Sequence, residues 1–290
     1  MLRISAVSKT YPHGVRALQD IDLTIGKGLF GLLGPNGAGK STLMRILATL
    51  QAPDTGQLRF DGVDVLADPQ AHRRHLGYLP QDFGVYPGVS AVELLDHLGV
   101  LKGLTNARQR REQVDALLQQ TNLHAHRKKA VSGFSGGMRQ RFGIAQALLG
   151  QPRMLIVDEP TAGLDPEERN RFHNLLSEVA EDVVVLLSTH IVEDVRQLCP
   201  RMAILSGGRV LREGIPDQLV GELTGRVWRK TVEKREVPAL RASRTVLSTQ
   251  LAGGRTVLRV LADEAPAPGF ESVPPDLEDV YFAALVGHGR

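Results

Sequence analysis

The stretch of the chain that most limits its possible folds is GPNGAGKST, residues 34–42. It follows the apolar run LFGLL and precedes LMRILATL, whose apolar residues recur at helical spacing. A glycine, four residues, then glycine, lysine and serine form the pattern of a phosphate-binding loop between a strand and a helix. In such a loop, backbone N–H groups and the helix N-terminus surround a polyphosphate. The pattern therefore predicts strand, loop and helix in this order.

Two side chains of this loop have specific predicted roles. The Lys40 ammonium is predicted to reach the terminal phosphates of a nucleotide, and the Ser41 hydroxyl to ligate Mg²⁺. The rest of the loop is predicted to contact phosphate mainly through backbone N–H groups. The predicted nucleotide-binding positions of the loop are Gly34, Pro35, Asn36, Gly37, Ala38, Gly39, Lys40, Ser41 and Thr42.

A second apolar run, MLIVDEP, ends in two carboxylates. Alone, such a run is typical of any strand that reaches solvent. Together with a phosphate-binding loop, Asp158 is predicted to hold Mg²⁺, because hard cations prefer oxygen ligands. Glu159 is predicted to act as the general base or to orient the attacking water.

The rest of the first 220 residues alternates strands with helices. The runs RMLIVD, DVVVLLS and RMAILSGGRVLREG are separated by helices that begin near Pro166 and Ile191, which predicts a mostly parallel sheet covered by helices. Residues from about 86 to 150 carry apolar side chains at three- and four-residue spacing. They predict a helical subdomain.

The composition changes near Gly221. Residues 226–244 contain seven basic residues against two acidic ones, and a strand, a loop rich in proline and alanine and a last helix follow. This order predicts a small appended domain. A basic run of this kind is most often a solvated strand face. The formal net charge of +3, spread over charges of both signs, gives no argument for a nucleic-acid partner.

No apolar run approaches the roughly 18 to 20 residues that cross a bilayer. The N-terminal stretch MLRISAVSKTY alternates like a strand and lacks the apolar core of a secretory signal. The single cysteine, Cys199, cannot form an internal disulfide, which fits a reducing compartment. We therefore expect a cytoplasmic chain whose membrane role depends on a partner.

The stretch FSGGMRQR, residues 134–141, places a serine and two glycines before a basic helical segment. Alone, it predicts an ordinary helix cap or an anion site at a helix N-terminus. With the motifs above, it closely resembles the signature motif of the ATP-binding cassette (ABC) ATPases. The resemblance runs from about residue 2 to 220 and includes the Q-loop with Gln81, the D-loop with Asp165, the switch histidine His190, and Tyr11 as an adenine-stacking aromatic residue.

This resemblance implies a fold and a site. It implies an α/β P-loop NTPase core of ABC type in residues 1–222, with an N-terminal antiparallel β subdomain and a helical subdomain at about 86–150, and a small C-terminal α+β accessory domain in residues 223–290. It implies ATP with Mg²⁺ as the bound species. Gln81 would be a further Mg²⁺ ligand and would take part in hydrolysis with Glu159, His190 and Lys40.

Taken singly, three of these residues have simpler interpretations. Tyr11 also fits a core position, Gln81 a surface loop, and His190 a helix cap. The stretch HAHRKK has no carboxylate or cysteine neighbours at ligand spacing, so it predicts a solvated loop rather than a metal site.

Two ABC cassettes pair head to tail, and the resemblance implies that a second copy of this chain is a partner. Ser135, Gly136 and Gly137 would then cap the γ-phosphate held by the other copy. Two departures from the family motif are Phe134 in place of leucine and Met138 in place of glutamine, which remove a polar side chain near the partner's nucleotide. We expect activity to survive this change.

The resemblance further implies the ATPase half of a transporter whose membrane-spanning subunits are separate chains. A short permease helix is expected in the groove between the Q-loop and the helical subdomain, near residues 81–93, on the cytoplasmic face of the membrane. Met138 and the tail PDLEDVYFAALVG resemble those of exporters. The transported substrate is not determined by any of these motifs.

Three other functions are alternatives to export. An importer ATPase shares the core motifs and remains open. A soluble ABC protein that acts on ribosomes or DNA would carry two cassettes with a charged linker, or a long coiled coil, and the sequence contains neither. A nucleoside kinase or GTPase would leave FSGGMRQR and His190 without a role.

Overall fold

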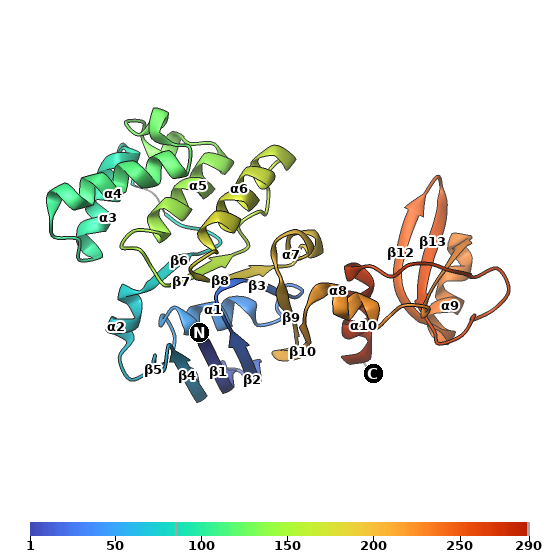
Figure 1. The fold of residues 1–290 in the computed structure, drawn as a ribbon. Helices are drawn as coiled ribbons and strands as arrows, with labels where there is room; N and C mark the ends of the chain where they lie inside the picture. The colour runs from blue at the N-terminus through green and yellow to red at the C-terminus, as the bar shows by residue number, and fades with distance from the viewer. Residues whose placement is uncertain (85, 289–290) are drawn as a thin grey trace.

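The computed structural model describes residues 1–84 and 86–288 (Figure 1). Val85, within the predicted Q-loop stretch, and residues 289–290 lie outside the described residues. The described strands form three sheets. Among the described residues, no helix combines the length and the apolar character that crossing a membrane requires.

The central sheet has the strand order β10-β9-β3-β8-β7-β6. Its neighbours are parallel except for the antiparallel pair of β9 and β10. The strands β7 and β8 are buried along their whole length, as expected where both faces of a parallel sheet are covered. The predicted α/β core is confirmed. The strands are β3 (Gly28–Leu33), β6 (Leu76–Leu79), β7 (Met154–Asp158), β8 (Val184–Thr189), β9 (Arg201–Ser206) and β10 (Arg209–Gly214).

An antiparallel sheet at the N-terminus covers one face of the central sheet. Met154 and Ile156 of β7 pack toward this sheet and α1, while the alternate residues Leu155 and Val157 pack toward the helices of the other face. This alternation follows from the two-residue period of a strand. The elements of this face are β1 (Leu2–Thr10), β2 (Arg16–Ile25), α1 (Lys40–Leu47), β4 (Thr55–Phe60), β5 (Val63–Asp64) and α2 (Pro69–Arg74).

Three helices between β6 and β7 form a layer on the opposite side of the central sheet (Figure 1). The first of them begins with a capping box, in which the Ser90 side chain accepts from the Glu93 N–H and the Glu93 carboxylate accepts from the Ser90 N–H. The elements here are α3 (Ala91–Leu101), α4 (Ala107–Gln120), the short 3₁₀ turns His124–His126 and Val131–Gly133, and α5 (Gly136–Ala147). The helices α6 (Pro166–Val179), α7 (Val192–Leu198) and α8 (Pro216–Gly221) follow later strands.

A third sheet, with the order β12-β13-β11-β14, stands apart from the other two, and α8 and α10 lie between it and the central sheet (Figure 1). Its core contains Val232, Leu258, Val260 and Phe270. The helix α10 contacts α7, α8, β9, β10 and β12, so it joins the C-terminal segment to the main core. The elements are β11 (Val227–Val232), the 3₁₀ turn Lys234–Glu236, α9 (Val237–Ser243), β12 (Thr245–Ala252), β13 (Arg255–Leu261), β14 (Glu271–Ser272) and α10 (Leu277–His288).

An ion pair fastens α10 to this sheet. Arg259 of β13 donates from Nε to Asp279 Oδ1 at 2.8 Å, and its Nη2 also contacts Asp279. Asp279 is 1% exposed, and it also accepts from the Asp276 N–H. The hydrogen bond to Asp279 raises the pKa of Arg259 above its usual value. A buried carboxylate therefore depends on this arginine for its countercharge.

We expect Arg259→Ala to lower the free energy of unfolding by about 3 kcal/mol, because it leaves the Asp279 carboxylate buried without its partner. Arg229→Ala is the matched control on the same sheet: its partner Glu271 is exposed, so the loss should stay below about 1 kcal/mol. Urea unfolding followed by the fluorescence of Trp228, the single tryptophan, measures both. Equal losses in the two variants would contradict a dominant role for the buried pair.

Candidate nucleotide-binding site

The phosphate-binding loop joins β3 to α1. Gly39, which precedes the first residue of α1, has φ 107°, and a Cβ at this position would lie 2.3 Å from the Ala17 carbonyl oxygen. Glycine is required here for both reasons. The Lys40 side chain is 5% exposed and donates from Nζ to the Gly34 carbonyl oxygen at 2.6 Å. The loop thus folds back over its own lysine at the N-terminus of a helix, where phosphate groups bind.

The predicted catalytic residues follow two neighbouring strands of the central sheet. Glu159 comes directly after β7, and His190 directly after β8. Glu159 Oε1 lies 3.2 Å from Lys40 Nζ, and Oε2 accepts a hydrogen bond from His190 Nδ1. Glu159 has φ 50°, a left-handed conformation that is unfavourable for a residue with a side chain. The strand order β3-β8-β7 brings these three side chains together.

Asp158 has the features of a ligand for a hard cation. Its side chain is 3% exposed, and its Oδ1 has no hydrogen-bond partner among the described residues. Burial raises the pKa of Asp158, and the neighbouring Ser188 and Ser41 hydroxyls offset this only in part. A buried carboxylate with an unpaired oxygen beside the Ser41 hydroxyl is the donor set that Mg²⁺ prefers. The residues present therefore fit this ion.

A cavity of about 340 Å³, called here the nucleotide cavity, opens over the phosphate-binding loop. The residues around it come from separate parts of the sequence. Tyr11 at its edge contacts Thr42 Oγ1 at 3.3 Å and donates to Gln51 Oε1 at 3.0 Å, and the Thr42 contact lowers the pKa of Tyr11. The predicted site residues that line the cavity are Tyr11, Pro35, Asn36, Gly37, Ala38, Gly39, Lys40, Ser41, Thr42, Gln81, Glu159 and His190.

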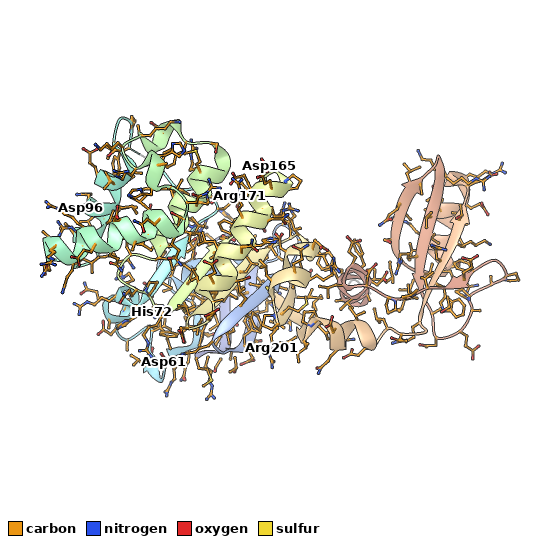
Figure 2. All side chains as sticks on the ribbon, turned by 45° about the horizontal axis from the view of Figure 1, so that its top comes forward. Asp61, His72, Asp96, Asp165, Arg171 and Arg201 are labelled. Carbon is orange, nitrogen blue, oxygen red and sulfur yellow. The ribbon has the colours of Figure 1, made fainter. Side chains whose placement is uncertain are left out.

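The predicted signature residues lie elsewhere. Ser135, Gly136, Gly137 and Asp165 do not line the nucleotide cavity. Ser135 Oγ caps α5 by accepting from the Met138 N–H at 3.2 Å. Asp165 caps α6 in the same way by accepting from the Glu168 N–H at 2.8 Å, and Figure 2 shows Asp165 at the end of that helix.

An ion pair that the sequence did not indicate joins these two helices. Arg141 of α5 donates to Glu168 of α6, and both side chains are largely buried. The two departures from the family motif also have a packing role: Phe134 is buried edge to face against Phe142, with ring centroids 6.2 Å apart, and Met138 packs against the same core. The signature segment thus forms one body with the start of α6.

Sequence reasoning missed further polar residues behind the site. Thr161, Thr189 and Asp194 form a buried hydrogen-bonded cluster that also includes His173. The helix α7 carries two adjacent carboxylates, Glu193 and Asp194, and the sequence alone does not indicate that Asp194 is the buried one. Gln51, which binds the Tyr11 hydroxyl, was also missed.

Comparisons with known proteins agree with this geometry. The family model described as ABC transporter matches residues 18–162. The daunorubicin/doxorubicin resistance ATP-binding protein DrrA of Streptomyces peucetius is 34% identical, with 99% of this chain and 92% of that protein aligned. This chain belongs to the ABC transporter family.

Two more relatives extend the comparison. This ABC ATPase is 36% identical to the Nod factor export ATP-binding protein I of Cupriavidus pinatubonensis, over 97% of this chain and 90% of that protein. A dimeric post-hydrolysis structure of the ATP-binding cassette MJ0796 bound to ADP and Pi superposes with a TM-score of 0.67 and 28% identity, covering 74% of this chain and 98% of that one. The protein is thus an ATP-binding and ATP-hydrolysing subunit of a transporter.

The close approach of α5 and α6 predicts different effects at two neighbouring glycines. A Cβ at Gly137 would lie 2.3 Å from Glu168 Oε2, and Glu168 is held by Arg141, whereas a Cβ at Gly136 meets nothing within 4 Å. We expect Gly137→Ala to lower the stability of the ABC ATPase by about 1–3 kcal/mol through overpacking. Gly136→Ala should unfold at nearly the wild-type temperature. Circular dichroism melting compares them, and equal melting temperatures would contradict the packing argument.

Proposed function

We propose that this chain drives export through a separate membrane permease, and that two copies sandwich ATP head to tail during each cycle. The observation that carries this proposal is the division of the site. The nucleotide cavity gathers Tyr11, the phosphate-binding loop, Glu159 and His190, while Ser135–Gly137 lie outside it. The cavity residues and Ser135–Gly137 lie apart within one chain because, in this proposal, Ser135–Gly137 face the phosphates that a second copy holds.

Within the site, each residue has a proposed role in hydrolysis. Glu159 orients or deprotonates the attacking water, and His190, which contacts Glu159, holds the γ-phosphate. Lys40 stabilises the negative charge that develops on the transferred phosphoryl group. Mg²⁺, held by Asp158 and Ser41 with Gln81 nearby, would supply further charge neutralisation at the phosphates. Tyr11 stacks on the adenine.

The arrangement of the two capped helix ends supports the proposed dimer. The signature segment offers the N-terminus of α5 and the Ser135 hydroxyl, a suitable partner for phosphate charge. Asp165 begins the adjoining α6, so it would reach the same interface. ATP then joins two copies because each nucleotide is contacted from both sides, and loss of the γ-phosphate releases them.

Glu159→Gln should retain ATP binding, block turnover and trap an ATP-bound dimer, because the amide cannot take a proton from water. Sedimentation with saturating Mg-ATP measures the dimer. Adding Gly136→Ala to this variant should weaken the dimer without unfolding the chain, since the new methyl group faces the proposed second copy. A Glu159→Gln protein that stays monomeric at saturating Mg-ATP would falsify the head-to-tail scheme.

A cavity of about 590 Å³ between the α1–α2 region and the α3–α5 layer is the proposed docking groove for a short permease helix. Leu50 and Leu101 at the groove are 62% and 71% exposed, an unusual state for large apolar side chains. Arg73, Arg74 and Lys102 also line it. The described residues of the interval 81–93, where the sequence placed the groove, do not line this cavity. An amphipathic helix fits these walls if its apolar face packs on the two leucines and its acidic face meets the basic side chains.

We expect Leu50→Asp and Leu101→Asp to abolish co-purification of a polytopic membrane protein from native membranes in mild detergent, because a carboxylate removes the apolar contact. ATP hydrolysis by the isolated chain should be unchanged. Leu251→Asp is the control: it is 80% exposed at a distant hairpin. Recovery of ribosomal or DNA-repair proteins in place of a membrane protein would favour the soluble alternatives and overturn the transporter partner.

Export and the accessory role of residues 223–290 rest on the relatives. The likeness to DrrA of Streptomyces peucetius and to the Nod factor export protein of Cupriavidus pinatubonensis extends over 97% or more of this chain, whereas the likeness to the MJ0796 cassette covers 74%. The alignment with these two relatives therefore includes the C-terminal segment. We propose that it braces the cassette through α10 on the cytoplasmic face of the membrane.

A further inference from the structure

A buried carboxylate on α7 lies at the centre of the cluster behind the site. Asp194 is 0% exposed. Its Oδ2 accepts hydrogen bonds from the hydroxyls of Thr161 and Thr189, the latter at 3.4 Å. Its Oδ1 accepts from His173 Nε2 at 3.0 Å, and Arg169 Nε lies 3.8 Å away. One side chain therefore contacts the segment after β7, the end of β8, and α6.

Asp194 keeps its charge in this buried position. Burial alone would raise its pKa, but the hydrogen bonds from His173 and Thr161 and the charges of His173 and Arg169 hold the pKa below its ordinary value. An ionised carboxylate makes stronger hydrogen bonds than a neutral group does. The Thr161 hydroxyl is thus held firmly and the Thr189 hydroxyl, at 3.4 Å, more weakly, and removal of either one takes a donor from the carboxylate.

The two threonines flank the proposed catalytic pair. Thr161 follows Glu159 by two residues, and Thr189 immediately precedes His190. The Thr189 hydroxyl oxygen also accepts from the Ile191 N–H at 3.0 Å, which fixes the backbone on both sides of His190. Glu159 occupies a left-handed backbone conformation, which persists only where the surroundings hold it. The Asp194 cluster contacts this segment two residues further on, through Thr161.

We propose that Asp194 is a positioning residue, which holds Glu159 and His190 at the spacing needed for hydrolysis through the hydroxyls of Thr161 and Thr189. The inference rests on the proposed roles of Glu159 and His190. It predicts a specific kinetic effect: the rate of hydrolysis falls, while ATP binding, which depends on the phosphate-binding loop and Tyr11, is unchanged.

The test compares hydroxyl removal at three buried threonines in the full chain. Thr161→Val and Thr189→Val should each lower kcat about tenfold, with the ATP dissociation constant within about twofold of wild type. Thr161→Ser and Thr189→Ser, which restore the hydroxyl, should recover most of kcat. Thr121→Val is the matched control, because Thr121 is 1% exposed, its hydroxyl donates to the Leu117 carbonyl, and it does not line the nucleotide cavity.

Asp194→Asn joins the series as the removal of charge at nearly constant size. It should lower kcat at least as far as either valine variant does. The threonine series does not depend on it, so a poorly folded Asp194→Asn protein leaves the test intact. The inference is overturned if Thr161→Val and Thr189→Val match Thr121→Val in kcat, or if their serine variants fail to recover it.

Glu159→Gln separates this inference from the proposed function. If Glu159→Gln still hydrolyses ATP at the wild-type rate, the proposed catalytic role fails, and the positioning role fails with it. If Glu159→Gln is inactive while the threonine variants keep full kcat, the proposed function stands and only the positioning role is wrong.

Discussion

The contact of a buried lysine with a buried glutamate is the interaction on which the site is built. Lys40 Nζ and Glu159 Oε1 lie 3.2 Å apart, with the two side chains 5% and 6% exposed. Charges in such a place require each other, since neither could be buried alone. Their meeting depends on the strand order of the central sheet, because β3 and β7 both adjoin β8 and end at the same edge. The apolar strands matter for function because their packing places the Lys40 and Glu159 side chains next to each other.

Much of this could be predicted from the sequence because its determinants are contiguous. A phosphate-binding loop needs glycine at position 39 and a lysine beside it. An apolar strand that ends at Asp158 and is followed by Glu159 is recognisable as buried, with two carboxylates at its end. The order of motifs then indicated the α/β core. Such local patterns can be recognised from the sequence, because the backbone geometry that requires them involves only a few successive residues.

The features that were missed depend on residues far apart in the sequence. Asp194 is notable only because it hydrogen-bonds with Thr161, Thr189 and His173, and none of these three residues is unusual by itself. The walls of the proposed docking groove come from the ends of separate helices, so no single stretch of the sequence predicts it. Side-chain partners of this kind follow from the packing of layers and not from any periodicity along the chain.

The position of α10 has a consequence for how the protein is made. Leu277, Val280 and Tyr281 join the same core as Val195 of α7, although they lie far beyond it in the sequence. During synthesis, the helix that carries Asp194 has no cover on that side until α10 has left the ribosome. The face of α7 that α10 covers is therefore completed last, so a nascent chain stalled within the C-terminal sheet would expose apolar surface at that face.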